Sequence, residues 1–146
     1  MSEVLVNGVA RSGDEPVEKL IADAHAGDTG RWAALAALGH SPDPRAYDAL
    51  AVLAASGDWT VRRAAVEALG RHPAGREAAA LLRARLRDRS AIVVRAACEA
   101  VASLGLAELR PDILSILRAP DAATRVAALR AVATLWAPED LPTVLA

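Results

Sequence analysis

One seven-residue pattern occurs four times along the chain at a nearly constant spacing. Its copies begin at Ala33, Ala64, Ala96 and Ala127, so successive copies start 31, 32 and 31 residues apart. Within each copy the apolar residues recur every three or four positions, and most of the residues are good helix formers. A fixed period of this length is typical of repeat proteins, in which each unit stacks only on its neighbours.

The residues around the copies predict two helices for each unit. An acid precedes each copy, at Asp28, Asp58, Asp88 and Asp121, where it can cap the next helix and favour the positive end of its dipole. Helix ends are expected at the glycines that close the first two copies, because a proline follows each of them. The predicted helices cover residues 16–26, 29–39, 44–56, 59–71, 74–88, 90–104, 107–118, 121–135 and 138–145.

This pattern predicts an all-α fold, a right-handed α-α superhelix (solenoid) of about four helix pairs. We expect a flexible leader over residues 1–14 and a single domain over 15–146, capped at its N-terminal end by the helix at 16–26. The 36 alanines among 146 residues, with no phenylalanine, indicate helices packed at close distance. The four units are expected to cover residues 28–57, 58–88, 89–120 and 121–146.

Composition and motifs give no support to catalysis, metal binding or a membrane span. The formal net charge of −1 removes bulk attraction to nucleic acid or membrane surfaces. No zinc-ligand spacing, nucleophile elbow or phosphate-binding glycine loop occurs, so no catalytic residue, metal or cofactor is expected. The single cysteine, Cys98, fits a reducing, cytoplasmic compartment and aligns with Leu35, Val66 and Leu129, all expected to be buried. His72 ends a predicted helix, where a partly charged imidazole would complement the dipole.

The segment from Asp58 to Gly70 resembles the short HEAT-like repeat found in phycobilisome lyases and many bacterial scaffold proteins. The resemblance extends over residues 28–137, although seven residues rather than four separate Asp88 from Arg95, which indicates a looser turn in the third unit. The resemblance implies that recurring acids and arginines form a structural ladder between neighbouring repeats. This ladder consists of Asp58, Asp88, Asp121, Arg62, Arg95 and Arg125.

A row of arginines is the main candidate for a binding surface. Residues 59–95 contain nine arginines and three acids. At 100° per residue, Arg76, Arg83 and Arg87 share the face opposite an apolar stripe, and Arg45 aligns with Arg76. The resemblance implies that second helices line the concave surface, where these arginines would meet an acidic protein or a phosphate. The alternative is an ordinary solvated helix face.

Arg85 breaks the apolar pattern of its own helix. It aligns with Ala54 and Leu117 in the neighbouring units. Either its stem packs on apolar surface and its charge reaches the edge of the repeat, or it forms a buried pair with an acid such as Glu99.

The last predicted helix carries apolar residues that lack an obvious partner. Leu141, Val144 and Leu145 fall on one face, and Trp136 lies beside them. We therefore predict a two-fold dimer through the fourth unit; the alternatives are a monomer with a frayed end and a longer parent protein.

Repeats without a catalytic set favour a non-catalytic scaffold that presents a curved helical surface to a protein partner. Two other classes stay open. One is a bilin-lyase-like enzyme or a chaperone subunit acting on a chromoprotein, and the other is a nucleic-acid binder resembling the HEAT-like DNA glycosylases. The neutral charge speaks against the nucleic-acid class.

Overall fold

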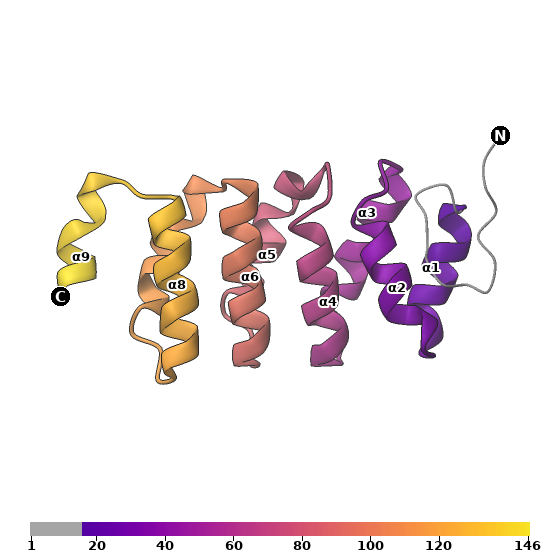
Figure 1. Cartoon of the computed structure of the whole chain (residues 1–146), viewed down its shortest axis with the longest axis horizontal. Helices are drawn as coiled ribbons and strands as arrows, with labels where there is room; N and C mark the ends of the chain where they lie inside the picture. Colours follow the sequence, from indigo (N-terminus) through magenta and orange to yellow (C-terminus); the bar gives the residue numbers. More distant parts are fainter. Residues whose placement is uncertain (1–15) are drawn as a thin grey trace.

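The computed structural model describes residues 16–146, and within that range every regular element is a helix. The expected leader at residues 1–14 lies outside the described residues. The longer helices stand side by side in two layers, with α2, α4, α6 and α8 in one row and α3, α5 and α7 behind them (Figure 1). The predicted all-α solenoid is therefore confirmed. The α-helices are α1 (Val17–Ala26), α2 (Gly30–Leu38), α3 (Pro44–Leu53), α4 (Trp59–Leu69), α5 (Ala79–Arg85), α6 (Ala91–Leu104), α7 (Arg110–Ile116), α8 (Ala122–Thr134) and α9 (Leu141–Leu145).

Each helix packs on its neighbours along the row. The first helices contact one another in the order α2, α4, α6 and α8, and the second helices α3, α5 and α7 contact the first helix of the following unit. Helix α1 covers α2 and α3 at the N-terminal end. Because every unit shares its apolar faces with the next, the buried side chains form one continuous core rather than a separate core for each pair.

Small residues allow the first helices to approach closely. A β-carbon added at Gly39 would lie 3.0 Å from the carbonyl oxygen of Ala68, and one at Gly70 would lie 3.0 Å from the Cα of Ala100. Both glycines end their helices, as the sequence predicts, but their φ angles of −63° and −62° are ordinary for any residue. The close approach of the next helix, rather than a left-handed cap, requires glycine here. The same reason explains the fully buried alanines Ala34, Ala65, Ala68, Ala97 and Ala128.

The second helices are shorter than the sequence predicts. Three of them start with a short 3-10 segment, at Gly75–Ala78 (η1), Ala107–Leu109 (η2) and Pro138–Asp140 (η3). No side chain caps the start of η1 or η2 with a hydrogen bond, so the chain enters these helices through the tighter turn.

The aspartates before the first helices satisfy backbone amides in two ways. Asp58 and Asp121 are the N-caps of α4 and α8, and their carboxylates accept from the amides of Thr60 and Thr124. Asp28 and Asp88 lie one and two residues upstream of the N-caps Thr29 and Ser90, and their carboxylates accept from the amides of Gly30 and Ser90.

Gly75 should tolerate no side chain. A β-carbon there would overlap the carbonyl oxygen of Leu69 and lie 2.8 Å from Cδ2 of Leu104. We expect Gly75→Ala to lower the free energy of unfolding by about 1–3 kcal/mol, because overpacking a filled site forces neighbours to move. Gly57→Ala is the matched control, since a β-carbon there meets nothing within 4 Å. Urea unfolding of both variants measures the difference, and equal stabilities would contradict the packing argument.

Candidate functional site

Arg62 of α4 and Asp88 in the turn between α5 and α6 form a buried ion pair. Arg62 Nε donates to Asp88 Oδ2 and Nη2 donates to Oδ1, each at 2.9 Å, and the side chains are only 6% and 3% exposed. Arg62 Nη1 also donates to the carbonyl of Ser56, and the Asp88 carboxylate accepts from the amide of Ser90. This two-pronged geometry is the strongest form of an arginine–carboxylate contact.

The surroundings keep the Asp88 carboxyl ionised. Burial by itself raises its pKa, but hydrogen bonds from Arg62 and from the Ser90 amide, with the charges of Arg62 and Arg85, lower the pKa below its ordinary value. The hydrogen bond to Asp88 raises the pKa of Arg62 in turn. Both partners therefore stay charged across the neutral range, as a buried pair must to be stable.

The third unit repeats this contact less tightly. Arg95 Nη1 donates to Asp121 at 3.3 Å and to the hydroxyl of Thr124 at 3.3 Å, and both members of the ion pair are partly exposed. Arg62 lies two residues before the Ala-Ala pair of its own unit. The residue at the same position of the third unit is Val94, which is buried. The longer spacing after Asp88 thus moves the arginine of this unit by one position, toward the surface.

Two of the predicted ladder residues make other contacts. Arg125 Nη1 donates to the carbonyls of Ala119 and Pro120 in the turn before α8. Asp58 caps α4, and the hydrogen bonds from Thr60 lower its pKa. The structure therefore brings together Arg62 with Asp88 and Arg95 with Asp121, while Arg125 and Asp58 hold the turns of their own units.

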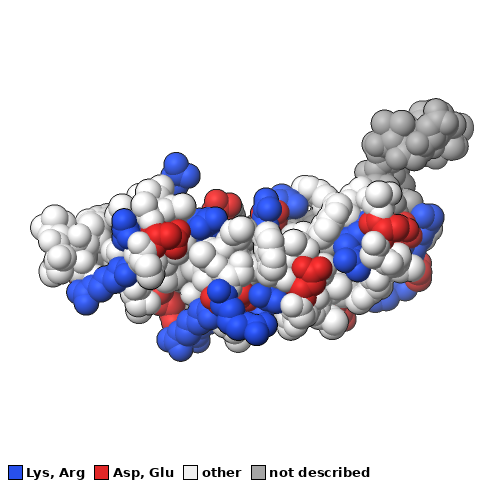
Figure 2. Space-filling view, turned by 90° about the horizontal axis from the view of Figure 1, so that it is seen from below, with Lys and Arg blue, Asp and Glu red and all other residues white. Residues whose placement is uncertain are grey.

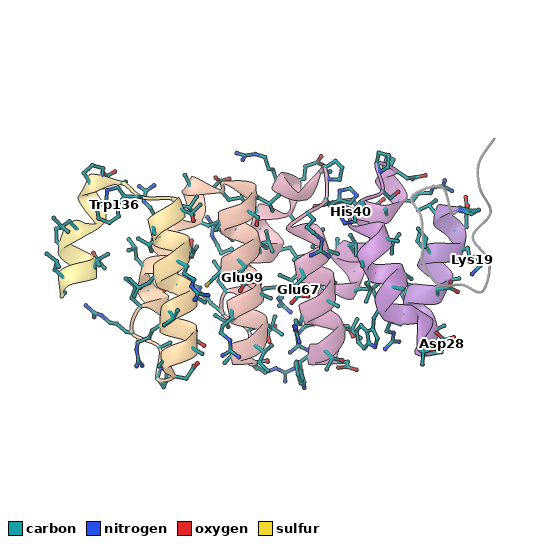
Figure 3. All side chains as sticks on the ribbon, viewed as in Figure 1. Lys19, Asp28, His40, Glu67, Glu99 and Trp136 are labelled. Carbon is teal, nitrogen blue, oxygen red and sulfur yellow. The ribbon has the colours of Figure 1, made fainter. Side chains whose placement is uncertain are left out.

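The acidic partner of Arg85 is Asp88, so the pairing with Glu99 is wrong. Arg85 Nη1 lies 3.2 Å from Asp88 and donates to the carbonyl of Ala54 at 3.3 Å. Glu99 instead belongs to the first-helix layer, where it lines a groove between α4 and α6 together with Glu67 (Figure 3). The Arg85 side chain is 23% exposed, which fits the expectation that its charge reaches the repeat edge.

All four arginines of the predicted binding row are exposed, and each contacts a neighbouring unit. Arg45 forms ion pairs with Asp43 at 2.7 Å and with Glu18 of α1. Arg76 donates to the backbone carbonyl of Leu104. The positive charge of Arg45 is therefore balanced by two acids, whereas Arg76 meets only a neutral acceptor.

Arg83 and Arg87 share one acid in the third unit. Their guanidinium groups lie 3.3 Å and 3.7 Å from the carboxylate of Asp112. The sequence reasoning missed Asp112 and Glu18 as partners. A search for opposite charges about one unit apart could have found them, because Arg45 and Glu18 are 27 residues apart and Arg83 and Asp112 are 29 apart.

The buried histidine and cysteine are electrically neutral. Burial lowers the pKa of His72, and its Nδ1 accepts a hydrogen bond from the amide of Ala74. Burial of the ring therefore disfavours the partly charged imidazole that was expected at this helix end. Burial likewise raises the pKa of the Cys98 thiol to about 12, so the thiol stays protonated.

His72 also lines a hollow of about 360 Å³ between the starts of α3 and η1. The ring of Tyr47 lies 5.9 Å from that of His72, and three prolines, Asp48 and Glu77 complete the walls.

The fourth unit exposes several large apolar side chains. Trp136, labelled in Figure 3, and Leu141 are half-exposed. Leu145 is 75% exposed, whereas Val144 packs against the core. Leu129 is also half-exposed, although it aligns with the buried Leu35, Val66 and Cys98. The expectation that it is buried is wrong, because α8 has no further first helix beside it among the described residues.

Residues 16–146 contain neither a metal-ligand cluster nor a membrane-spanning helix. Within that range no three His, Cys, Asp or Glu side chains are grouped closely enough to hold a metal ion. None of the described helices has both the length and the apolar character that a membrane span requires.

Comparison with known proteins gives one match. A family model described as HEAT repeats matches residues 14–102, which is more than half of the 146 residues. None of the curated proteins compared matches the chain.

Proposed function

Because this chain belongs to the family of HEAT repeats, we propose that it is a non-catalytic scaffold that binds an acidic protein partner. HEAT repeats generally mediate protein–protein interaction. One observation supports this proposal most. In the second-helix layer, Arg83 and Arg87 of the second unit are exposed, and the single carboxylate of Asp112 neutralises their two positive charges only in part.

The partner surface of the proposal is centred on Arg76, Arg83 and Arg87. Asp112 supplies one negative charge to two of them, and Arg76 has only a backbone carbonyl as acceptor. The three guanidinium groups thus keep a net positive charge and unused donors, which suits carboxylates on a partner. Arg45 lies at the margin of this surface, because its charge is balanced locally.

Reversing the charge of Arg76, Arg83 and Arg87 to glutamate should abolish partner binding and leave the fold intact. The ion pairs with Asp112 are solvated, so their loss costs at most about 1 kcal/mol of stability. The measurement compares proteins retained from a cell extract by the wild-type chain and by the variant, followed by titration of the retained protein in increasing salt, which should weaken wild-type binding.

A variant with Arg63, Arg71 and Arg130 changed to glutamate is the matched control, because it makes the same charge change on α4, in the turn after α4 and on α8. We expect it to retain the partner. If the second-helix variant retains the same protein with the same affinity, the arginine row is a solvated helix face and has no role in recognition.

A second proposal concerns self-association through the fourth unit. Its support is the exposure of Trp136, Leu141 and Leu145 at one end of the row, together with Leu129 on α8. Clustered exposed apolar side chains mark interaction surfaces, and a two-fold axis would place the same patch of two chains face to face.

The proposal also covers the cellular location of the chain and its division into repeat units. We infer a cytoplasmic location, which is supported by the single cysteine and its buried thiol. We also propose that residues 15–146 form one domain. Its units cover residues 28–57, 58–88, 89–120 and 121–146, and each unit comprises one first helix and one second helix.

A further inference from the structure

A hollow of about 300 Å³ lies between the turn that precedes α4 and the turn that precedes α6. The turn at residues 55–57 forms one wall, and Arg62, Arg85, Arg87, Asp88 and Arg89 form the rest. Lys and Arg side chains gather near the middle of the row when this edge faces the viewer (Figure 2).

The positive charge of this hollow exceeds its negative charge. Four guanidinium groups line it, but Asp88 is its one acidic side chain among the lining residues. Both oxygens of that carboxylate are already bound by Arg62 at 2.9 Å, so Arg85 shares an acceptor that is in use. Arg87 reaches Asp112 only at 3.7 Å, and within residues 16–146 no ion pair holds Arg89. The hollow therefore contains donors for which the fold provides too few acceptors.

Arg85 shows this shortage most directly. Its Nε is buried and has no hydrogen-bond partner. The helix packing does not require an arginine at this register, because Ala54 and Leu117 occupy it in the neighbouring units. A buried guanidinium donor without an acceptor is destabilising, so its presence needs an explanation beyond packing.

We propose that this hollow binds a phosphate group, either free phosphate or a phosphate monoester, through Arg85, Arg87 and Arg89. A phosphate carries nearly two negative charges and several acceptor oxygens, which matches three guanidinium groups better than one carboxylate does. A small rotation of Arg85 brings its unused donors to the ligand, while the Arg62–Asp88 pair stays in place as the wall. Arg87 belongs to both this site and the Arg76, Arg83 and Arg87 row, whereas Arg85 and Arg89 belong to this site alone, so their variants test it separately from the acidic-partner proposal.

The test is a calorimetric titration of the full chain with sodium phosphate and, separately, with O-phosphoserine, at constant ionic strength set by sodium chloride. Thermal melting under the same conditions gives a second readout, because a ligand that binds the folded chain raises the melting temperature. We expect Arg89→Ala and Arg85→Leu each to weaken phosphate binding at least about tenfold, since each removes a charge-assisted contact.

Arg118→Ala is the matched control, because Arg118 is an exposed arginine in the equivalent turn of the next unit. It removes the same charge from the same edge and should leave binding unchanged. Arg89 is exposed, so its variant decides the question even if Arg85→Leu folds poorly. Binding of O-phosphoserine as well as phosphate supports a monoester ligand, and binding of phosphate alone supports the free ion. The proposal is overturned if the titration with phosphate releases or absorbs no heat and phosphate raises the melting temperature no more than chloride does. It is also overturned if Arg118→Ala weakens phosphate binding as much as Arg89→Ala does.

Discussion

Replacing Asp88 by alanine should lower the free energy of unfolding by about 3–5 kcal/mol. The substitution leaves Arg62 buried with no counter-ion, and it also removes the acid that Arg85 contacts at 3.2 Å. Breaking a buried pair costs far more than the pair contributes, because the remaining charge is desolvated and uncompensated. The melting temperature should fall by at least about 6 °C for a chain of this size.

The pH dependence of stability separates this ion pair from simple packing. The folded-state pKa of Asp88 lies below its ordinary value of 3.8, so the pair contributes its full stability above that value and loses it as the pH falls through the folded-state pKa. The wild-type chain should lose stability more steeply than Asp88→Ala between about pH 5 and pH 2.

Glu67→Ala is the control for this prediction. It removes one acid from an exposed pair with Arg63 on the same helix, and such pairs contribute at most a few tenths of a kcal/mol. If Asp88→Ala were no less stable than Glu67→Ala, the buried ion pair between Arg62 and Asp88 would not stabilise the fold.

The fold was predictable because its signal is local and repeated. Helix formers at three- and four-residue spacing, with an aspartate before each first helix, define the elements without knowledge of their partners. The glycines illustrate the limit of such reasoning. Their positions predicted helix ends correctly, but the reason for them is the next helix, since Gly39 faces Ala68 and Gly70 faces Ala100.

Contacts between units were predictable only where the units are equivalent. The family pattern indicated a ladder of acids and arginines that includes Arg62 and Asp88, but it did not assign their pairing or show that Val94 takes the register of Arg62 in the third unit. It also treats all copies as having the same neighbours. Leu129 is exposed although its counterparts are buried, because among the described residues no further first helix packs on the outer side of α8.

The partners of the arginine row show the same limit. A helical projection placed Arg83 and Arg87 on one exposed face, and both are exposed. The projection contains no information about the next unit, so it omitted Asp112, which reduces the charge of that face. The excess of arginine around Asp88 was also missed, because the residues that line this hollow come from two helices and two turns rather than from one helix face.

Self-association through the fourth unit should double the molecular mass of the chain at micromolar concentration. Leu145 is the most exposed of its apolar side chains, and an aspartate at this position would place a charge in the proposed interface. We expect Leu145→Asp to be monomeric in light scattering, with a melting temperature that no longer depends on protein concentration, as the wild-type melting temperature should.

Val52→Asp distinguishes this interface from a general effect of surface charge. Val52 is 65% exposed on α3, far along the row from the fourth unit, so its substitution changes the same chemistry elsewhere. The proposed dimer requires Val52→Asp to keep the doubled mass while Leu145→Asp loses it. A wild-type chain that stays monomeric at every concentration would falsify the dimer. The same conclusion follows if both variants have the wild-type mass, because a charge at the centre of a two-fold apolar interface meets its own copy across the axis.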